Sequence, residues 1–513
     1  MAAAAFHRPG PDTHLTDRLR MKFRLCWLAL MLFPQAVTAH VFTQPYTLPV
    51  PFSIYAYAAT GALLLSFVVI GLFSAAPSLG RFRVRPVPAP RRAVASHPWT
   101  TVGRITSVSF LVLCVLTGWF GSQNAFVNLN MTLFWIGFVL GLPYAVALFG
   151  DFYAPVNPWK TLTAWVRYAT GLSFAGRVRY PAALGYWPAL LLYMGFIWIE
   201  LFAELRPRGL STALAGYTVV NLAGAYVFGR HVWFRYGEFF GVFLRLIGLM
   251  SPRTRLRGAD NPAAGQESAA AAAADGQRWR LPFIGLLDEP APHLSLVLFI
   301  LFMLSSTAFD GLHSTLPWVS LYWKHLYPAI APWLNPAPGQ QFLLSTKIYY
   351  LWQWLSLLLS PVVYMALFAG FVRLAKAITR SPHSSHMLVL RLAMSLVPIA
   401  FVYHLTHYYT VFLVQAGQIV RLASDPFGFG WNLFGTAGWT IKPVMLDVGS
   451  IWLTQVVLIL AGHIVSVYLA HVEALRIFGS ARQAALSQLP MLGLMMVFTN
   501  LGLWILSLPL AGG

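Results

Sequence analysis

Two histidines lie within one apolar stretch of the chain, at a spacing that suits metal binding. His404 and His407 occur in PIAFVYHLTHYYTVFL, and a separation of three residues, about 300° around an α-helix, places both imidazoles on one face. A titratable side chain in a membrane span is costly unless it faces the protein interior and a partner. Imidazole is a preferred zinc ligand, so the pair predicts a metal site. Hydrogen bonding between helices and a proton relay are the alternatives.

Three further residues extend this candidate site. Asp310 and His313 end another apolar stretch in STAFDGLH, where Gly311 permits a close turn. A helix-end cap is the alternative role for these two residues. His463 lies midway along a later stretch and is the weakest candidate. Imidazole and carboxylate ligands suit a divalent metal ion such as zinc, and an open coordination position would hold an activated water. The predicted metal ligands are His404, His407, Asp310, His313 and His463.

Other chemical signals are weaker. Glu200 and Glu204 lie near the end of one apolar stretch, close to Arg206 and Arg208, and we expect these residues to form ion pairs at the interface. No HExxH, GxSxG, P-loop or GxGxxG motif occurs in a supporting context. The catalytic residues therefore stay unassigned, and no cofactor other than the metal is predicted. A site in this chain must be assembled from separate helices.

The composition identifies the elements that must position these residues. The chain has 513 residues, of which 58% are hydrophobic and only 10% are charged. Soluble globular domains contain about 25% charged residues, so a soluble enzyme and a disordered chain are both excluded. The net charge of +20 is interpreted as membrane topology rather than nucleic-acid binding. The lipid bilayer is the expected partner, and no nucleic acid is expected.

Ten apolar stretches have the length of membrane spans. The sequence therefore predicts an all-α, polytopic integral membrane helix bundle. The predicted spans lie near residues 52–74, 105–121, 130–150, 184–204, 212–229, 291–310, 346–372, 388–415, 449–471 and 489–509.

The start of the chain resembles a secretion signal. Residues 1–39 comprise a polar extension and, from Met21, the segment MKFRLCWLALMLFPQAVTA. It has a basic start, a short apolar core and small residues at its end, as signal peptides do. We expect Met21 to be the initiator and the mature N-terminus to lie outside. The gaps then predicted to face the cytoplasm contain 23 Lys and Arg and the outward gaps 5, as the positive-inside rule requires. A bacterial inner membrane is the expected location.

A low-complexity segment divides the chain. Residues 259–277 read ADNPAAGQESAAAAAADGQ, a composition typical of a flexible linker. The predicted organisation is a first five-helix half at 40–257, a cytoplasmic linker at 258–280 and a second five-helix half at 281–513. Residues 234–250, just before the linker, are aromatic and aliphatic with two arginines. We expect this segment to lie along the inner leaflet.

Several of these segments, in order, resemble membrane-bound fenitrothion hydrolases of bacteria. The resemblance rests on TLPVPFSIYAYAATGALLLSFVVIGLF within residues 39–73, GDFYAPVNPWKTL at 150–162, FDGLHSTLPW at 309–318 and HLTHYYTVFLVQAGQIVRLASDPFG at 404–428. It implies hydrolysis of an organophosphate triester with release of a substituted phenol, in a complex with related membrane subunits. It assigns no catalytic residues.

Two functional hypotheses and a third, simpler one follow. The first is a membrane hydrolase that cleaves an apolar small-molecule triester with metal-activated water at the His/Asp site. The second is a transporter or metal-handling permease that uses the same histidines for transient cation or proton binding. The third is a non-catalytic membrane subunit in which the histidines pack helices. A hydrolase requires a cluster near one face, whereas a transporter requires polar groups that continue to both faces.

Overall fold

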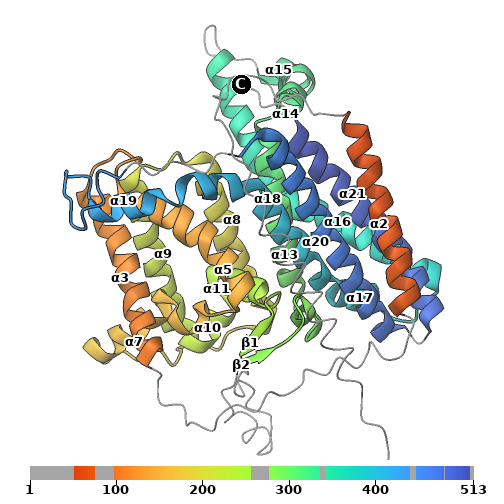
Figure 1. The fold of residues 1–513 in the computed structure, drawn as a ribbon, viewed down its shortest axis with the longest axis horizontal. Helices are drawn as coiled ribbons and strands as arrows, with labels where there is room; N and C mark the ends of the chain where they lie inside the picture. The colour runs from red at the N-terminus through yellow and green to blue at the C-terminus, as the bar shows by residue number, and fades with distance from the viewer. Residues whose placement is uncertain are drawn as a thin grey trace, which may run out of the picture.

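The fold is a bundle of long helices (Figure 1). The computed structural model describes residues 51–74, 98–255, 277–334, 341–439, 446–478 and 480–508. The expected signal peptide at 1–39, its cleavage site and most of the expected linker lie outside these described residues.

Ten helical stretches are long and apolar enough to cross a membrane, and they coincide with the ten predicted spans. The all-α polytopic prediction is therefore confirmed. The first five stretches are α2 (Phe52–Ser74), α3 (Pro98–Phe120), the continuous α4–η2–α5 segment (Leu129–Met131, Thr132–Gly141, Leu142–Phe149), α8 (Trp187–Phe202) and α9 (Pro207–Phe228). The other five are α13 (Leu294–His313), α16 (Gln341–Thr379), α17–η6–α18 (Ser385–Leu392, Ala393–Leu396, Val397–Gln415), α20 (Val448–Ile477) and α21 (Ala481–Ser507).

Short elements connect the spans at the two ends of the bundle. They are α6 (Tyr153–Val156), α7 (Pro158–Thr170), η3 (Ala182–Leu184), α10 (Arg230–Tyr236), η4 (Ile284–Leu287), α14 (Leu316–Leu321), η5 (Tyr322–Leu326), α15 (Tyr327–Leu334) and α19 (Gln418–Ser424). Strands β1 (Arg253–Arg255) and β2 (Gln277–Trp279) form one antiparallel pair.

The spans pack as two groups that differ from their order in the sequence. The first group contains the spans from α3 to α9, and the second contains the spans from α13 to α21 together with α2; the short helix α19 packs on α4 and η2 of the first group. Helix α2 packs against α20 and α21, as its position beside α21 in Figure 1 shows. The Asn500 amide of α21 also donates a hydrogen bond to the Thr60 hydroxyl of α2, at 3.1 Å. The first span thus belongs, in space, to the second group.

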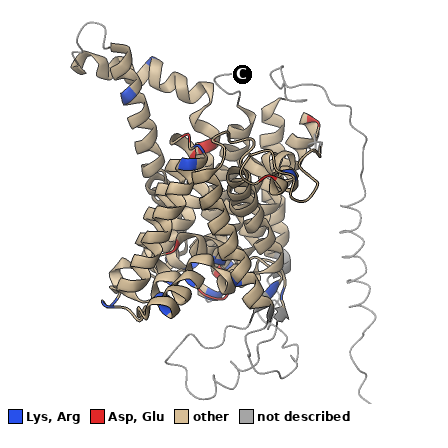
Figure 2. Cartoon of the chain, turned by 90° about the vertical axis from the view of Figure 1, so that its left-hand side faces the viewer, with Lys and Arg blue, Asp and Glu red and all other residues tan. Residues whose placement is uncertain are grey.

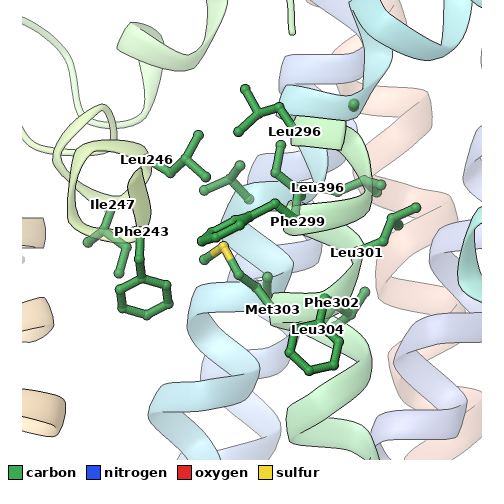
Figure 3. Close-up of a cluster of buried hydrophobic side chains, with 14 of the residues drawn as sticks. Phe243, Leu246, Ile247, Leu296, Phe299, Leu301, Phe302, Met303, Leu304 and Leu396 are labelled. Atoms are coloured by element: carbon green, nitrogen blue, oxygen red, sulfur yellow. The ribbon is translucent and has the colours of Figure 1, made fainter. Parts of the chain in front are cut away.

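Helix α11 (Phe239–Gly248) lies between the two groups. It packs against α5 and α8 of the first group and α18 of the second. Figure 3 shows Phe243 and Leu246 of α11 on the side of α13 from which Phe299 and Met303 project. Eight of its ten residues are buried, which is typical of a helix that is apolar on all sides. The expectation that residues 234–250 lie along a leaflet is therefore wrong for α11.

The two ends of the bundle differ in charge. Figure 2 shows Lys and Arg gathered at one end, with few at the other. We call the end formed by α7, α10, the β1–β2 pair and α17 the arginine end. The opposite end carries α14, α15 and α19 (Figure 1). This asymmetry agrees with the charge bias counted in the sequence, which is the basis of the predicted orientation.

Candidate functional site

A small cavity lies between the two groups of helices. It offers about 30 Å³ to the centres of water molecules, enough for about two waters. A drug-sized ligand requires a site of about 300–1,000 Å³, so this space has room for water but not for a triester. The polar side chains that line it are Tyr193, Glu200, Ser306, Thr307, Asp310, His404 and Tyr408.

Two donors from α18 meet Asp310 of α13 at this cavity. His407 Nε2 lies 2.7 Å from Asp310 Oδ2. The Tyr408 hydroxyl donates to the same oxygen at 2.6 Å. The side chains of His407 and Asp310 are 22% and 17% exposed, so both lie in a mostly dehydrated environment. This contact places Asp310 beside one of the two histidines of α18, and the metal site predicted from these residues stays a prediction.

The hydrogen bond to Asp310 determines which tautomer a neutral His407 ring adopts. An ionised carboxylate only accepts hydrogen bonds, so the ring nitrogen that faces it carries a proton. In the neutral imidazole, Nδ1 is then the acceptor. No described residue donates a hydrogen bond to His407 Nδ1, and the ring is partly exposed. The pair therefore presents an available base beside a negative charge, an arrangement that can accept a proton from water.

His313 joins this pair only loosely. Its Nδ1 lies 2.8 Å from the backbone oxygen of Asp310 and 3.9 Å from the carboxylate Oδ1. Its ring stacks on Phe309, with centroids 5.5 Å apart, and meets the edge of Phe202. One nitrogen is therefore engaged within its own helical turn, as the helix-end alternative described.

His404 lines the cavity one helical turn from Tyr408. Their rings lie 4.9 Å apart. His404 Nδ1 is buried with no hydrogen-bond partner among the described residues, and so is the Tyr144 hydroxyl. The Tyr144 and His404 rings meet edge to face at 6.2 Å. An orphaned buried polar atom is uncommon, so both groups mark a place where a polar ligand or water fits.

Glu200 belongs to this cavity rather than to an ion pair. It lines the same space as Asp310 and His404, and no ion pair links it to a described arginine. The expectation that Glu200 pairs with Arg206 or Arg208 is therefore wrong. Helix α8 contributes it from the first group, so the cavity brings a carboxylate from each group together.

His463 lies elsewhere. It lines a separate space with Tyr403 and Tyr364, and its Nδ1 bonds to the backbone oxygen of Ile459 at 2.8 Å. Among the residues that the structure describes, no group of three or more His, Cys, Asp or Glu side chains is placed to hold a metal ion. Of the five predicted ligands, Asp310 and His407 form a close pair, and His313 and His404 lie next to it. His463 is distant. Metal binding stays a prediction.

Local packing at Gly311 brings α13 close to α21. A Cβ on Gly311 would lie 2.8 Å from Ile505 Cγ2 of α21, which is too close, whereas His407 Cε1 at 3.6 Å would be in ordinary contact. The expected turn at Gly311 is wrong, because α13 continues to His313. The wall of the small cavity also includes Phe138 and Val139, which belong to the π-helical segment η2. π-Helical segments are rare and frequently occur at functional sites.

Sequence reasoning missed Tyr408 and undervalued Glu200. Tyr408 follows His407 directly and lies four residues after His404, so it shares the site-facing side of α18. A tyrosine beside two intramembrane histidines was the available signal. For Glu200, the signal was a carboxylate inside a predicted span, which by default faces a protein interior.

Comparison with protein-family models, with curated proteins and with solved structures finds no match for this chain. The class that the fold defines is an all-α, multi-pass membrane helix bundle with an enclosed polar site between two groups of helices.

Proposed function

We propose that this protein is an integral membrane hydrolase that cleaves organophosphate triesters, as its resemblance to fenitrothion hydrolases implies. The observation that supports this best is the hydrogen bond between His407 Nε2 and Asp310 Oδ2, which leaves Nδ1 as an available base. In the proposed orientation the arginine end faces the cytoplasm of a bacterium and the site lies toward the outer side of its inner membrane.

The proposed reaction requires only water, the substrate and residues of this chain. His407 Nδ1 accepts a proton from water while the water oxygen attacks phosphorus. The bond from phosphorus to the aryl oxygen breaks, and the phenolate that leaves takes up the proton from His407. Asp310 stabilises the imidazolium formed in between, and Tyr408 holds the carboxylate in place. A divalent metal, if bound, would lower the pKa of water and polarise the phosphoryl oxygen.

Access to the site constrains the substrate. The enclosed cavity is too small for a triester, so the substrate must approach His407 from its exposed side. Aromatic rings pack around the end of α13: Phe309 meets Trp318 edge to face, and the indoles of Trp318 and Trp352 stack at 4.3 Å. An apolar neutral triester partitions into the bilayer and suits such an approach.

The test is release of nitrophenol from a nitrophenyl phosphotriester by the purified full chain in detergent. His407→Gln should lower turnover by about 10²–10⁴-fold, the range of a general base. His325→Gln is the matched control, because His325 is exposed at the same end of the bundle and lines no described cavity. Metal content is measured on the same samples. Wild-type turnover without bound metal supports the Asp310–His407 base, and metal lost together with turnover in His407→Gln supports the predicted zinc site.

Absence of turnover in a folded wild type would overturn the hydrolase proposal. It would favour a non-catalytic subunit or the second candidate below. A related membrane subunit, which the resemblance implies, would be sought by co-purification from the native host.

A proton-coupled transporter is the second candidate, and one observation favours it. The cavity has room for about two waters, and Glu200, Asp310 and His404 line it, which suits transient proton binding better than triester binding. In proteoliposomes with an imposed pH gradient, wild type would then carry proton flux that Glu200→Gln reduces. Flux without nitrophenol release selects the transporter, and release without flux selects the hydrolase.

A further inference from the structure

A second and larger cavity lies at the arginine end, also between the two groups of helices. It offers about 740 Å³ to the centres of water molecules, within the range of small-molecule sites. We call it the basic cavity, and its wall comes from residues 149–155, α10, α11, residues 280–292 and the beginning of α13. Its charged lining residues are Arg235, Arg245, Arg253, Arg280, Asp151, Asp288 and Glu289.

Arg280 builds the wall of this cavity. Its Nη2 donates to the backbone oxygens of Gly248 at 3.1 Å and Leu249 at 2.8 Å. Its Nε donates to the backbone oxygen of Ser251 at 2.9 Å. Its Nη1 lies 3.3 Å from Asp288 Oδ2. These contacts occupy the guanidinium and balance the charge of Asp288, so Arg280 fastens the chain after β2 to the end of α11.

Arg235 and Arg253 are held differently, by aromatic rings. Arg235 Cζ lies 5.4 Å from the centre of the Tyr236 ring. Arg253 Cζ lies 4.8 Å from the Trp279 ring and 5.9 Å from the Phe149 ring. Neither arginine forms an ion pair with any carboxylate in the described ranges. Stacking on a ring face leaves the in-plane N–H groups of a guanidinium able to donate to an anion.

Arg245 of α11 contacts α10 on this basic wall. Its Nη2 donates to the backbone oxygen of Arg235 at 3.0 Å, and its Cζ lies 5.8 Å from the Tyr186 ring. Asp151 lies against Gly248 at the end of α11, next to this wall, and its carboxylate accepts a hydrogen bond from the backbone of Ala154 at 3.0 Å. The basic side chains thus gather on the wall formed by α10, α11 and β1, whereas Asp288 and Glu289 lie in the segment before α13.

The remaining lining is apolar and comes from both groups of helices. It includes Leu246 of α11 and Leu249 at its end, and Leu296 and Met394 of the second group. A cavity with arginines on one wall and aliphatic side chains on the others suits an amphiphile with an anionic head. Arginine is also the side chain whose planar fork best matches phosphate oxygens.

We propose that the basic cavity binds the phosphate group of an anionic phospholipid. The cavity lies where the spans end at the arginine end, which is the depth of lipid headgroups. Basic pockets between transmembrane helices at such a level bind anionic lipid headgroups. Arg235 and Arg253 receive the phosphate, and the apolar wall receives the glycerol backbone and the first carbons of the acyl chains. This inference does not depend on the proposed function.

The test is native mass spectrometry of the delipidated full chain in detergent, titrated with phosphatidylglycerol or with phosphatidylcholine. Phosphatidylglycerol should bind more tightly to wild type. A basic residue near anionic lipid changes affinity by about fivefold, so Arg235→Gln/Arg253→Gln should weaken binding by about 25-fold. Arg177→Gln is the matched control, because Arg177 also lies over a ring, that of Tyr226 at 5.1 Å, but outside the basic cavity. It should leave binding unchanged.

Two further arms make the result decisive. Arg235→Lys/Arg253→Lys retains the charge and should recover part of the affinity, which separates binding from a folding defect. Inorganic phosphate and glycerol phosphate are offered as competitors. Full displacement of the lipid by millimolar inorganic phosphate would reassign the cavity to a soluble phosphate compound. Equal binding of phosphatidylcholine, or the same loss in Arg177→Gln, would overturn the proposal.

Discussion

Replacing Asp310 by asparagine tests the site most directly, because it removes a charge and keeps the shape. Both donors, His407 Nε2 and the Tyr408 hydroxyl, point at one oxygen, Oδ2, at 2.7 and 2.6 Å. In Asp310→Asn, the amide oxygen can take that position and accept both hydrogen bonds. The amide nitrogen then occupies the place of Oδ1, which lies 3.9 Å from His313 Nδ1.

The magnitude follows from what the carboxylate does in the proposed reaction. Two unit charges about 4 Å apart attract by about 4 kcal/mol at an effective dielectric constant of about 20. Asp310→Asn removes this attraction for the imidazolium that forms on His407, and about 4 kcal/mol is about a 10³-fold loss of turnover. Stability should fall by only about 2 kcal/mol, since two hydrogen bonds to a charged acceptor become bonds to a neutral one.

Tyr408→Phe distinguishes the charge of Asp310 from the hydrogen bonding at its Oδ2. It removes one hydrogen bond to Asp310 Oδ2 and leaves the carboxylate ionised. Stability should fall by about 1.5–3 kcal/mol, which is comparable to the loss in Asp310→Asn, whereas turnover should fall by less than about tenfold. Nitrophenol release and thermal unfolding of both variants in detergent provide the two measurements. The loss of turnover in Asp310→Asn should lower kcat rather than raise KM, because the charge on His407 develops only during the reaction.

Folded Asp310→Asn that retains more than a tenth of wild-type turnover would show that the charge of Asp310 does not assist the reaction. Equal fractional losses of turnover in the two variants would show the same, because the carboxylate would then act only as a packing partner.

Two further predictions concern packing and a buried carboxylate. Gly311→Val should destabilise the protein by about 1–3 kcal/mol, since even its Cβ would lie only 2.8 Å from Ile505 Cγ2. Gly370→Val, with open space around it, should change thermal unfolding little, and equal shifts in the two variants would contradict this role of Gly311. Glu238→Gln should cost about 3 kcal/mol, because the buried Glu238 side chain accepts four hydrogen bonds and an amide would turn a donor toward another donor. Glu289→Gln is the control, because Glu289 is exposed. Equal free energies of unfolding for the two variants, measured by chemical unfolding in mild detergent, would contradict this prediction.

The spans were predictable because their physics is local. A run of about 20 apolar residues is long enough to cross the hydrocarbon core, and this depends on no other part of the chain. The limits of α16 were less predictable, since it extends from Gln341 to Thr379, beyond the predicted 346–372. Helical hydrogen bonding continues past the membrane when nothing in the sequence ends it. The packing of α2 with the second group depends on distant helices, so sequence order misleads there.

The site was predictable in part for the same reason. His404 and His407 share a helix face, and their spacing alone indicates this. That Asp310 meets His407 depends on the crossing of α13 and α18, which no spacing reveals. Glu200 was assigned to nearby arginines because neighbours in sequence are visible, whereas the cavity that receives it forms only when α8 packs against the second group. The separation of His463 from the others has the same origin.

Helix α11 separates the two cavities described above. Its Phe243 and Leu244 border the small polar cavity, and the next two residues, Arg245 and Leu246, border the basic cavity. One rigid helix is therefore a wall of both spaces. A ligand that moves α11 from one side changes the shape of the space on the other side. Free-energy coupling between sites is reciprocal, so any change in affinity that one cavity's ligand causes at the other cavity must be matched by the same factor in the reverse direction.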